Sequence, residues 1–262
     1  MAYAKIKYEA EAGVALITLS DPATLNAISV DMTEELVDAF SRAVADARCI
    51  VLTGEGRGFS SGANLAGGAP PMGEDGLPDL GGRLEQTFNP FVTLLRDLPI
   101  PYVTAVNGVA AGIGCSFALL GDLIVASESA YFLQAFRRIG LVPDGSATYH
   151  LPRMIGRVRA MEMMLLGEKI PAKTAFDWGL INRCVPDAEL MPTAKALALE
   201  LANGPTKTLG MIRRLGWASL DNAWGQQIHA EREAQKQAGR TEDFREGVQA
   251  FFQKRKAEFK GT

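Results

Sequence analysis

Four short apolar runs rich in β-branched residues recur along the first half of the chain, at Val14–Leu19, Cys49–Gly54, Tyr102–Gly108 and Asp122–Ser127. Runs of this length and composition are typical of strands that are buried on both faces of a sheet. Between the first two runs, apolar side chains recur at helical spacing from Val30 to about Asp46, and Ser29 is a suitable N-cap. Strands that alternate with helices imply right-handed βαβ connections. The sequence therefore predicts an α/β fold.

The second half of the chain has the apolar periodicity of helices. One helix is expected over residues 157–166, and a short one is expected between Pro171 and Gly179, residues suited to a helix start and a helix end. Four more are expected at Glu189–Ala202, Pro205–Leu215, Leu220–Gln237 and Thr241–Phe259. The patterns thus predict an α/β core over residues 1–195 and a helical C-terminal region over residues 196–262.

Composition and charge exclude several classes of protein. The chain of 262 residues is 47% hydrophobic and 22% charged, as an ordinary soluble globular protein is. Its net charge of −3 argues against a nucleic-acid partner, which normally needs a basic surface. The first residues lack the apolar core of a signal peptide, and no apolar run is long enough to cross a bilayer. No membrane partner is therefore expected.

Cysteine and histidine usage indicates a cytoplasmic protein without a metal site. Cys49, Cys115 and Cys184 are odd in number and lie in apolar contexts, as buried reduced thiols do. The two histidines, His150 and His229, form no cluster with a cysteine, so a zinc site is not expected. We expect His150 to be a structural histidine.

Two segments of small residues each follow a predicted strand, "GRGFSSGANL" (Gly56–Leu65) and "NGVAAGIGCSFALL" (Asn107–Leu120). Small residues allow backbone N–H groups to face a ligand without obstruction. The second segment lacks the Lys-Ser/Thr pair of a nucleotide-binding loop. Two N–H groups from separate strand ends can hold one carbonyl oxygen, helped by the dipole of a helix that begins near Gly112. The two segments together predict an oxyanion hole.

Residues 67–82, "GGAPPMGEDGLPDLGG", are too rich in glycine and proline for a regular element. Loops of this length are commonly functional or mobile. The segment is interpreted either as a flexible flap beside a pocket or as a disordered surface insertion.

Several segments together resemble the crotonase superfamily of enoyl-CoA hydratases and isomerases, and the resemblance covers almost the whole chain. It is carried by "LNAIS" (Leu25–Ser29), the two small-residue segments, "GRVRAMEMMLLGEKIPAKTAFDWGLINRCVP" (Gly156–Pro186) and "EGVQAFFQKRKAEFKG" (Glu246–Gly261). Three further segments resemble the branch of the family that isomerises ring epoxides and double bonds in bacterial phenylacetate degradation: "LEQTFNPFV" (Leu84–Val92), "AFRRIGLVPDGSATYHLPR" (Ala135–Arg153) and "AGRTEDFREGVQAF" (Ala238–Phe251).

The resemblance implies a fold, an assembly and a substrate class. The fold is a crotonase-type spiral of ββα units followed by a helical trimerisation region. The assembly is a homo-oligomer, either a trimer or a dimer of trimers. The substrates are acyl-CoA thioesters, so coenzyme A enters as part of the substrate. No metal and no redox cofactor is implied.

The resemblance also assigns site residues. The two oxyanion N–H groups fall at Ala63 and Ile113, where Ile113 replaces a more common glycine but keeps the N–H. Leu25 and Ala27 are expected to line the coenzyme A arm. The remaining substrate contacts are expected from Asn64, Leu65, Ala66, Phe136, Phe251 and Lys254. The last two match residues that, in this family, can touch coenzyme A bound by a neighbouring subunit.

The catalytic acids of the family's hydratases are not present. Their two glutamates fall at Ser116 and Phe136, and a hydroxyl and a phenyl ring are poorly suited to holding water and moving its proton. Asp144, in "GLVPDGSAT", remains, and isomerases that resemble this sequence keep an acid at this position. Its alternative role is that of a turn residue, because Pro-Asp-Gly is a common turn triplet.

One carboxylate is sufficient to shift a double bond. It can take a proton from C2 and return it at C4 while the oxyanion hole holds the dienolate, and burial would raise its pKa toward a useful value. We expect Leu141, Val142 and Phe136 to surround Asp144. The sequence thus favours an isomerase that moves a double bond, or isomerises an unsaturated ring, in an acyl-CoA ester. Two alternatives stay open: a 2-enoyl-CoA hydratase that uses Asp144 with an ordered water, and a protein that binds CoA esters with little turnover.

Overall fold

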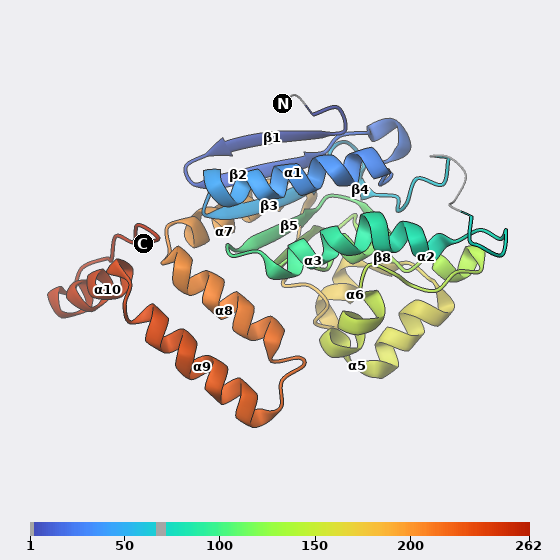
Figure 1. Cartoon of the computed structure of the whole chain (residues 1–262). Helices are drawn as coiled ribbons and strands as arrows, with labels where there is room; N and C mark the ends of the chain where they lie inside the picture. Colours follow the sequence, from blue (N-terminus) through green and yellow to red (C-terminus); the bar gives the residue numbers. More distant parts are fainter. Residues whose placement is uncertain (1–2, 67–71) are drawn as a thin grey trace.

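The computed structural model describes residues 3–66 and 72–262 and shows strands and helices in the predicted alternation (Figure 1). The strands stack in the upper part of Figure 1, with α1 and α3 running across them. The last helices, α8, α9 and α10, extend away from the strands. They place the C-terminal region on the side of the molecule opposite α2 and α5.

The described strands form two sheets. One has six strands in the order β1-β2-β3-β5-β7-β10, and the other has four in the order β4-β6-β8-β9. The pairs β1–β2 and β8–β9 are antiparallel, and the remaining described pairs are parallel. The strands are β1 (Ile6–Glu11), β2 (Val14–Leu19), β3 (Cys49–Gly54), β4 (Gly58–Ser60), β5 (Tyr102–Val106), β6 (Val109–Ala111), β7 (Leu123–Ser127), β8 (Tyr131–Leu133), β9 (Ile170–Pro171) and β10 (Arg183–Val185).

The α-helices connect and cover the sheets. They are α1 (Val30–Asp46), α2 (Leu80–Arg83), α3 (Asn89–Asp97), α4 (Ile113–Ala118), α5 (Ala147–Leu166), α6 (Ala172–Asp177), α7 (Leu190–Ala202), α8 (Thr206–Ala218), α9 (Trp224–Ala238) and α10 (Glu242–Gln253). A π-helical turn, Leu84–Phe88, joins α2 to α3, and short 3₁₀ turns cover Pro22–Thr24, Phe136–Ile139 and Asp187–Glu189. Among the described residues, no helix combines the length and the hydropathy of a membrane span.

Each turn of the chain adds one strand to each sheet. β3 is followed by β4, β5 by β6 and β7 by β8, so successive turns stack on one another. Between β5 and β6 the backbone at Gly108 passes too close to the preceding turn for a side chain, because a Cβ there would lie 2.2 Å from the backbone oxygen of Arg57. Asn107 ties this corner to the preceding one by donating from Nδ2 to the Gly56 oxygen at 3.0 Å. This spiral of ββα units is the predicted architecture.

Alternate residues of the central strands enter two cores. In β3, Ile50 and Leu52 face the larger core, which includes the apolar faces of α1 and α3, whereas Cys49 and Val51 face a second core that α7 closes. The predicted boundary between residues 195 and 196 falls inside α7, whose apolar face packs on the first sheet as one element. The division into two units stays a prediction.

Most of the predicted elements are confirmed. The strand Val14–Leu19 and the helix Val30–Asp46 have the expected bounds, and the Ser29 hydroxyl accepts the Met32 N–H at 3.1 Å as an N-cap. The predicted helix Thr241–Phe259 is too long, since it ends at Gln253. Lys254 then adopts a left-handed conformation (φ 55°), and the following chain returns to α10. There the Asp243 carboxylate accepts the N–H of Lys260 at 2.7 Å.

The segment over residues 67–82 was expected to contain no regular element, and this was wrong at its C-terminal end. Helix α2 begins at Leu80, and the Asp79 side chain caps it by accepting the Gly82 N–H at 3.0 Å. Residues 67–71 lie outside the described residues, so the choice between a flap and a disordered insertion stays open.

Candidate active site

The first N–H of the predicted oxyanion hole belongs to Ala63, shortly after β4. Ile28 pairs in parallel with this segment, donating its N–H to the Gly62 oxygen and accepting the Asn64 N–H, both at 2.8 Å. In a parallel pair, the residue between two such bonds turns its own N–H away from the partner strand. Accordingly, the Ala63 N–H has no acceptor within the described residues.

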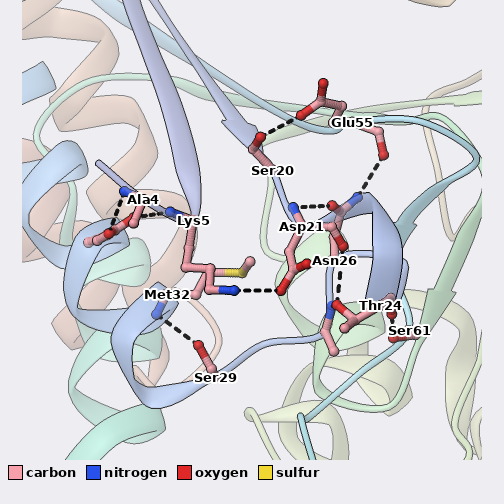
Figure 2. A network of polar contacts seen from close by, with 12 residues as sticks. Ala4, Lys5, Ser20, Asp21, Thr24, Asn26, Ser29, Met32, Glu55 and Ser61 are labelled. Atoms are coloured by element: carbon pink, nitrogen blue, oxygen red, sulfur yellow. Dashed lines mark hydrogen bonds and ion pairs between the residues drawn. The ribbon is translucent and has the colours of Figure 1, made fainter. Parts of the chain in front are cut away.

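A buried asparagine holds this first segment in place. Asn26 is fully buried and donates from Nδ2 to the backbone oxygens of Glu55 at 3.0 Å and Gly58 at 2.8 Å, while its Oδ1 accepts the Asp21 N–H at 2.9 Å. Figure 2 shows this residue at the centre of a polar network between the chain around Asp21 and the turn at Glu55. Leu25 and Asn26 both have a left-handed backbone, with φ values of 56° and 55°. The side-chain bonds of Asn26 stabilise this uncommon conformation.

The second N–H belongs to Ile113, the first residue of α4. The first N–H groups of a helix have no partner inside it, and that of Ile113 finds no acceptor in residues 3–66 and 72–262. The preceding residue, Gly112, has a positive φ of 51° and donates its own N–H to the Leu133 oxygen at 2.8 Å. This bond fixes the start of α4, and with it the position of the Ile113 N–H.

The two N–H segments lie against each other. A Cβ on Gly62 would lie 3.0 Å from the Ala111 oxygen and 3.8 Å from the Gly112 Cα. A Cβ on Gly114 would lie only 2.5 Å from the Ser60 hydroxyl oxygen. Glycine is required at these positions for so close an approach. Because Ala63 and Ile113 follow the contacting glycines directly, their N–H groups are neighbours in space.

Asp144 lies in a turn that packs on α4. Its backbone oxygen accepts the Ser116 hydroxyl at 3.0 Å and the Ala147 N–H at 3.1 Å. The next residue, Gly145, has a φ of 59°, and a Cβ on it would lie 2.7 Å from the Ser116 Cβ and 3.3 Å from the Ile113 Cγ1. The turn therefore brings Asp144 next to the helix that supplies the Ile113 N–H.

The Asp144 carboxyl group makes no hydrogen bond to the described residues, and its Oδ1 atom is buried. An aspartate that serves a turn or an N-cap accepts a nearby backbone N–H, which this carboxyl does not do. Burial raises the pKa of Asp144 from 3.8 to about 6. Such a group can take up and return a proton near neutral pH.

No acid stands at the two positions where the hydratases that this chain resembles carry glutamate. Ser116 is fully buried and bonded to Asp144. Phe136 is also buried, and a Cβ on Gly112 would lie 3.9 Å from its Cζ atom, so its ring lies beside the second N–H segment. Asp144 is thus the carboxylate that these contacts bring to the pair of N–H groups.

The surroundings of Asp144 differ in part from those predicted. The Val142 side chain is 80% exposed, so most of its surface faces solvent, whereas Leu141 is 37% exposed and Phe136 is buried. The turn instead contacts Ser116 and Ile113, which the spacing along the chain did not reveal. His150 is buried with Nδ1 3.1 Å from the Ser146 hydroxyl, and burial lowers its pKa to about 4. A neutral, buried histidine of this kind has a structural role.

The other predicted substrate contacts fall into two groups. Leu25, Ala27, Asn64, Leu65 and Ala66 all lie on or beside the first N–H segment; the Leu25 oxygen, for example, accepts the Ser61 N–H at 2.9 Å. Phe251 and Lys254 lie at the end of α10, on the opposite side of the molecule from α5 (Figure 1). Their contact with coenzyme A on a neighbouring subunit stays a prediction.

Comparison with known proteins identifies the family of the chain. Residues 9–262 match the family model described as enoyl-CoA hydratase/isomerase. The chain belongs to the enoyl-CoA hydratase/isomerase family. This confirms the family predicted from the sequence.

Two relatives within this family are 43% identical to the chain. One is a "probable enoyl-CoA hydratase" of Rhodobacter capsulatus, aligned over 100% of both chains. The other is the 1,2-epoxyphenylacetyl-CoA isomerase of Escherichia coli, aligned over 96% of both. Their names divide between hydratase and isomerase, so the similarity leaves the reaction open.

Solved structures of the family have the same fold. The enoyl-CoA hydratase of Bacillus anthracis superposes with a TM-score of 0.90 at 27% identity and covers 99% of this chain and 100% of its own. An enoyl-CoA hydratase of Polaromonas sp. JS666 gives a TM-score of 0.88 at 29% identity, with 97% and 99% covered. The spiral described above is therefore the crotonase fold of this family.

Proposed function

We propose that this member of the enoyl-CoA hydratase/isomerase family is an isomerase that shifts a carbon–carbon double bond in an acyl-CoA thioester. The observation that carries the proposal is the Asp144 carboxyl group, which is partly buried, lacks a hydrogen-bond partner among the described residues and belongs to a turn packed on Ile113. With serine at 116 and phenylalanine at 136, it is the carboxylate that the described contacts bring to the N–H pair.

In the proposed reaction, ionised Asp144 removes a proton from C2 of a 3-enoyl thioester. The electron pair of the broken C–H bond moves into the thioester group, and negative charge develops on its oxygen. The N–H groups of Ala63 and Ile113 stabilise this charge, as preorganised donors do in other oxyanion holes. The protonated Asp144 then returns the proton at C4, which gives the 2-enoyl thioester. The reaction is balanced with one proton and consumes no cofactor.

A pKa of about 6 suits both halves of this cycle. Above this pH the carboxyl group is ionised and able to act as a base. A carboxyl with an ordinary pKa would hold the proton too weakly to deliver it efficiently to carbon. The same burial that raises the pKa also keeps water from competing for the proton.

A 2-enoyl-CoA hydratase is the second candidate, because a relative at 43% identity bears that name. Water addition requires groups that orient the water and transfer its proton. The Ser116 hydroxyl already donates its hydrogen to the Asp144 backbone oxygen and is not free to orient a water, so Asp144 would have to perform both tasks. We therefore place the hydratase second among the candidate functions. A protein that binds CoA esters with little turnover is the third candidate.

We also propose that the chain works as a homo-oligomer, either a trimer or a dimer of trimers. Phe251 and Phe252 on α10 are 79% and 78% exposed, and they border a hollow of about 510 Å³ in the C-terminal region. Its lining is mainly apolar and also includes Thr208, Gln235 and Asp243. Exposed apolar patches of this kind are typical of protein–protein contacts. In such an assembly Phe251 and Lys254 would contact the substrate of a neighbouring subunit.

Incubation with a 3-enoyl-CoA and, separately, a 2-enoyl-CoA tests the proposal. The products are followed by chromatography and by the mass gain that hydration produces. We expect the 3-enoyl ester to become the 2-enoyl ester without a change in mass. Fast hydration of the 2-enoyl ester with slow isomerisation would favour the hydratase, and no change in either ester would favour the binding protein.

A further inference from the structure

The hydroxyl of Ser116 has no part in the proton transfer proposed above, yet it makes a specific bond. Ser116 lies in α4, three residues after Ile113, and is fully buried. Its Oγ donates to the backbone oxygen of Asp144 at 3.0 Å, across 28 positions of sequence. This bond links the helix that begins with an oxyanion N–H to the turn that carries the proposed base.

The turn at Asp144 has a backbone conformation that contacts with the surrounding residues must stabilise. Gly145 and Ser146 follow it with φ values of 59° and 65°, and a left-handed conformation is uncommon for a residue other than glycine. Conformations of this kind persist where the surrounding structure holds them. The Asp144 oxygen accepts two bonds, from Ser116 and from the Ala147 N–H, and the second only closes the turn on itself.

The Asp144 side chain is not held by any bond of its own within the described chain. The direction of its carboxyl group therefore depends on the backbone of the turn. The Ser116 Cβ also packs against Gly145, since a Cβ on this glycine would lie only 2.7 Å from it. Ser116 therefore holds the turn on α4 through two contacts, the hydroxyl bond to Asp144 and the packing of its Cβ on Gly145.

We propose that Ser116 is a positioning residue, whose hydroxyl aims the Asp144 carboxyl group at the carbon atoms next to the thioester held by Ala63 and Ile113. The inference rests on the proposed isomerase function. Ser116 acts through the Asp144 backbone and does not touch the substrate in this proposal.

The test uses the whole chain, a 3-enoyl-CoA, four single variants and one double variant. Ser116→Ala removes the hydroxyl but keeps the Cβ contact with Gly145. It should lower kcat roughly 10- to 100-fold, the range expected when a catalytic group is displaced by up to about 1 Å. KM should stay within about twofold, because the oxyanion and coenzyme A contacts are unchanged. Ser116→Cys, of similar size but a weak donor, should behave like Ser116→Ala.

Ser127→Ala is the matched control. Ser127 is also buried, in β7; its hydroxyl donates to the Val106 oxygen at 3.4 Å and lies 3.4 Å from the Ser129 hydroxyl oxygen. It should lower the unfolding temperature by an amount similar to that of Ser116→Ala but leave kcat within about twofold of the wild type, since deleting one buried hydroxyl bond costs about 1 kcal/mol.

A double-variant cycle with Asp144→Asn separates positioning from general loosening of the fold. If Ser116 acts through the base, Ser116→Ala should cause no further loss of kcat in the Asp144→Asn background. A similar loss in both backgrounds, or equal kcat values for Ser116→Ala and Ser127→Ala, would overturn the inference while the function stands. Wild-type kcat in Asp144→Asn itself would overturn the proposed function, and the inference with it.

Discussion

At the scale of single residues, the Asp144 carboxyl group is costly for the fold. Burial without a partner among the described residues raises its pKa from 3.8 to about 6, which means that the folded protein disfavours the ionised form. Below pH 3.8 the carboxyl is neutral in both the folded and the unfolded chain, and no cost arises. The cost grows as the pH rises and is complete above about pH 6.

Asp144→Asn should therefore stabilise the protein at neutral pH. The amide is neutral at every pH, so the variant avoids the cost of burying the charge, on the order of 1–3 kcal/mol. Thermal unfolding at pH 7.5 should show a higher midpoint for the variant, and the difference should fall toward zero as the pH is lowered to about 4. Equal midpoints at both pH values would show that the carboxyl group is well solvated.

The N–H of Ala63 gives a second prediction at this scale. Ala63→Gly keeps the N–H and should change kcat by less than about threefold, whereas Ala63→Pro removes it and should lower kcat by roughly 100-fold or more. Circular dichroism and thermal unfolding of both variants provide the control for folding. If the two folded variants turn over equally fast, the N–H of Ala63 is not an oxyanion donor.

Sequence reasoning found the residues with distinctive chemistry but not those that hold them. Asp144 was found because isomerases that resemble this sequence keep an acid at this position, while the two glutamate positions of the hydratases hold Ser116 and Phe136. Asn26 was missed, although it lies in "LNAIS", because its three hydrogen bonds join backbone groups that only the folded corner brings together. Asn107 was missed for the same reason. Asn107 carries one weak signal, because it directly precedes the first glycine of the second small-residue segment.

At the scale of elements, residues 140–146 connect the 3₁₀ turn at Phe136–Ile139 to α5 and include two glycines with positive φ values. Gly140 (φ 73°) has open space where a Cβ would be, whereas Gly145 (φ 59°) faces Ser116 and Ile113. Both glycines have a left-handed backbone that would strain any other residue, but only Gly145 is in contact with α4. They form a natural pair for testing the packing of the turn on α4.

Gly145→Ala should lower both stability and activity, while Gly140→Ala should lower mainly stability. Each variant carries the strain of a left-handed alanine, about 1–2 kcal/mol. The added methyl group at 145 also pushes the turn away from α4, and kcat should fall roughly 10-fold or more. The measurement is kcat against unfolding temperature for both variants. The same kcat in both would show that the turn does not need to touch α4.

The helices and strands that could be predicted from the sequence are those whose position is set by one local feature, such as a cap residue or an apolar run. The buried strands follow from apolar composition, and α1 follows from its Ser29 cap and apolar spacing. The end of α10 was not predictable, because Phe259 continues the apolar pattern while tertiary bonds turn the chain back. Arg255 bonds Glu246 at 2.6 Å, and Asp243 accepts the Lys260 N–H. Helix α2 was not predicted, because its Asp79 cap lies in a segment whose many glycine and proline residues argue against a helix.

At the scale of the whole molecule, one buried arginine joins the C-terminal helices to the spiral. Arg213 of α8 donates from Nε to the Asp122 carboxylate at 2.7 Å, from Nη1 to the Leu98 oxygen at 3.0 Å and from Nη2 to the Leu95 oxygen. The backbone of α8 also touches Pro99 closely, since a Cβ on Gly210 would lie 2.0 Å from its oxygen. The position of α8 is therefore fixed by polar contacts as well as by apolar packing.

Arg213→Met should lower the free energy of unfolding by roughly 3–5 kcal/mol, because it leaves the Asp122 carboxylate and backbone oxygens without their partner. Urea unfolding at fixed protein concentration measures the change. Arg214→Met is the matched control, since Arg214 is the next residue of α8 and is exposed. It should shift stability by less than about 0.5 kcal/mol. Equal effects of the two substitutions would contradict the assigned role of Arg213.

If Asp144 is the proton carrier of a double-bond isomerase, its loss should affect turnover but not binding of the substrate. The most direct measurement compares the wild type and Asp144→Asn for kcat on a 3-enoyl-CoA and for the Kd of a non-reactive acyl-CoA, measured by calorimetry. For Asp144→Asn we expect a kcat lower by roughly 100- to 10,000-fold, the effect of losing a general base, and a Kd that changes less than about threefold. A folded Asp144→Asn variant that isomerises at the wild-type rate would contradict this role of Asp144.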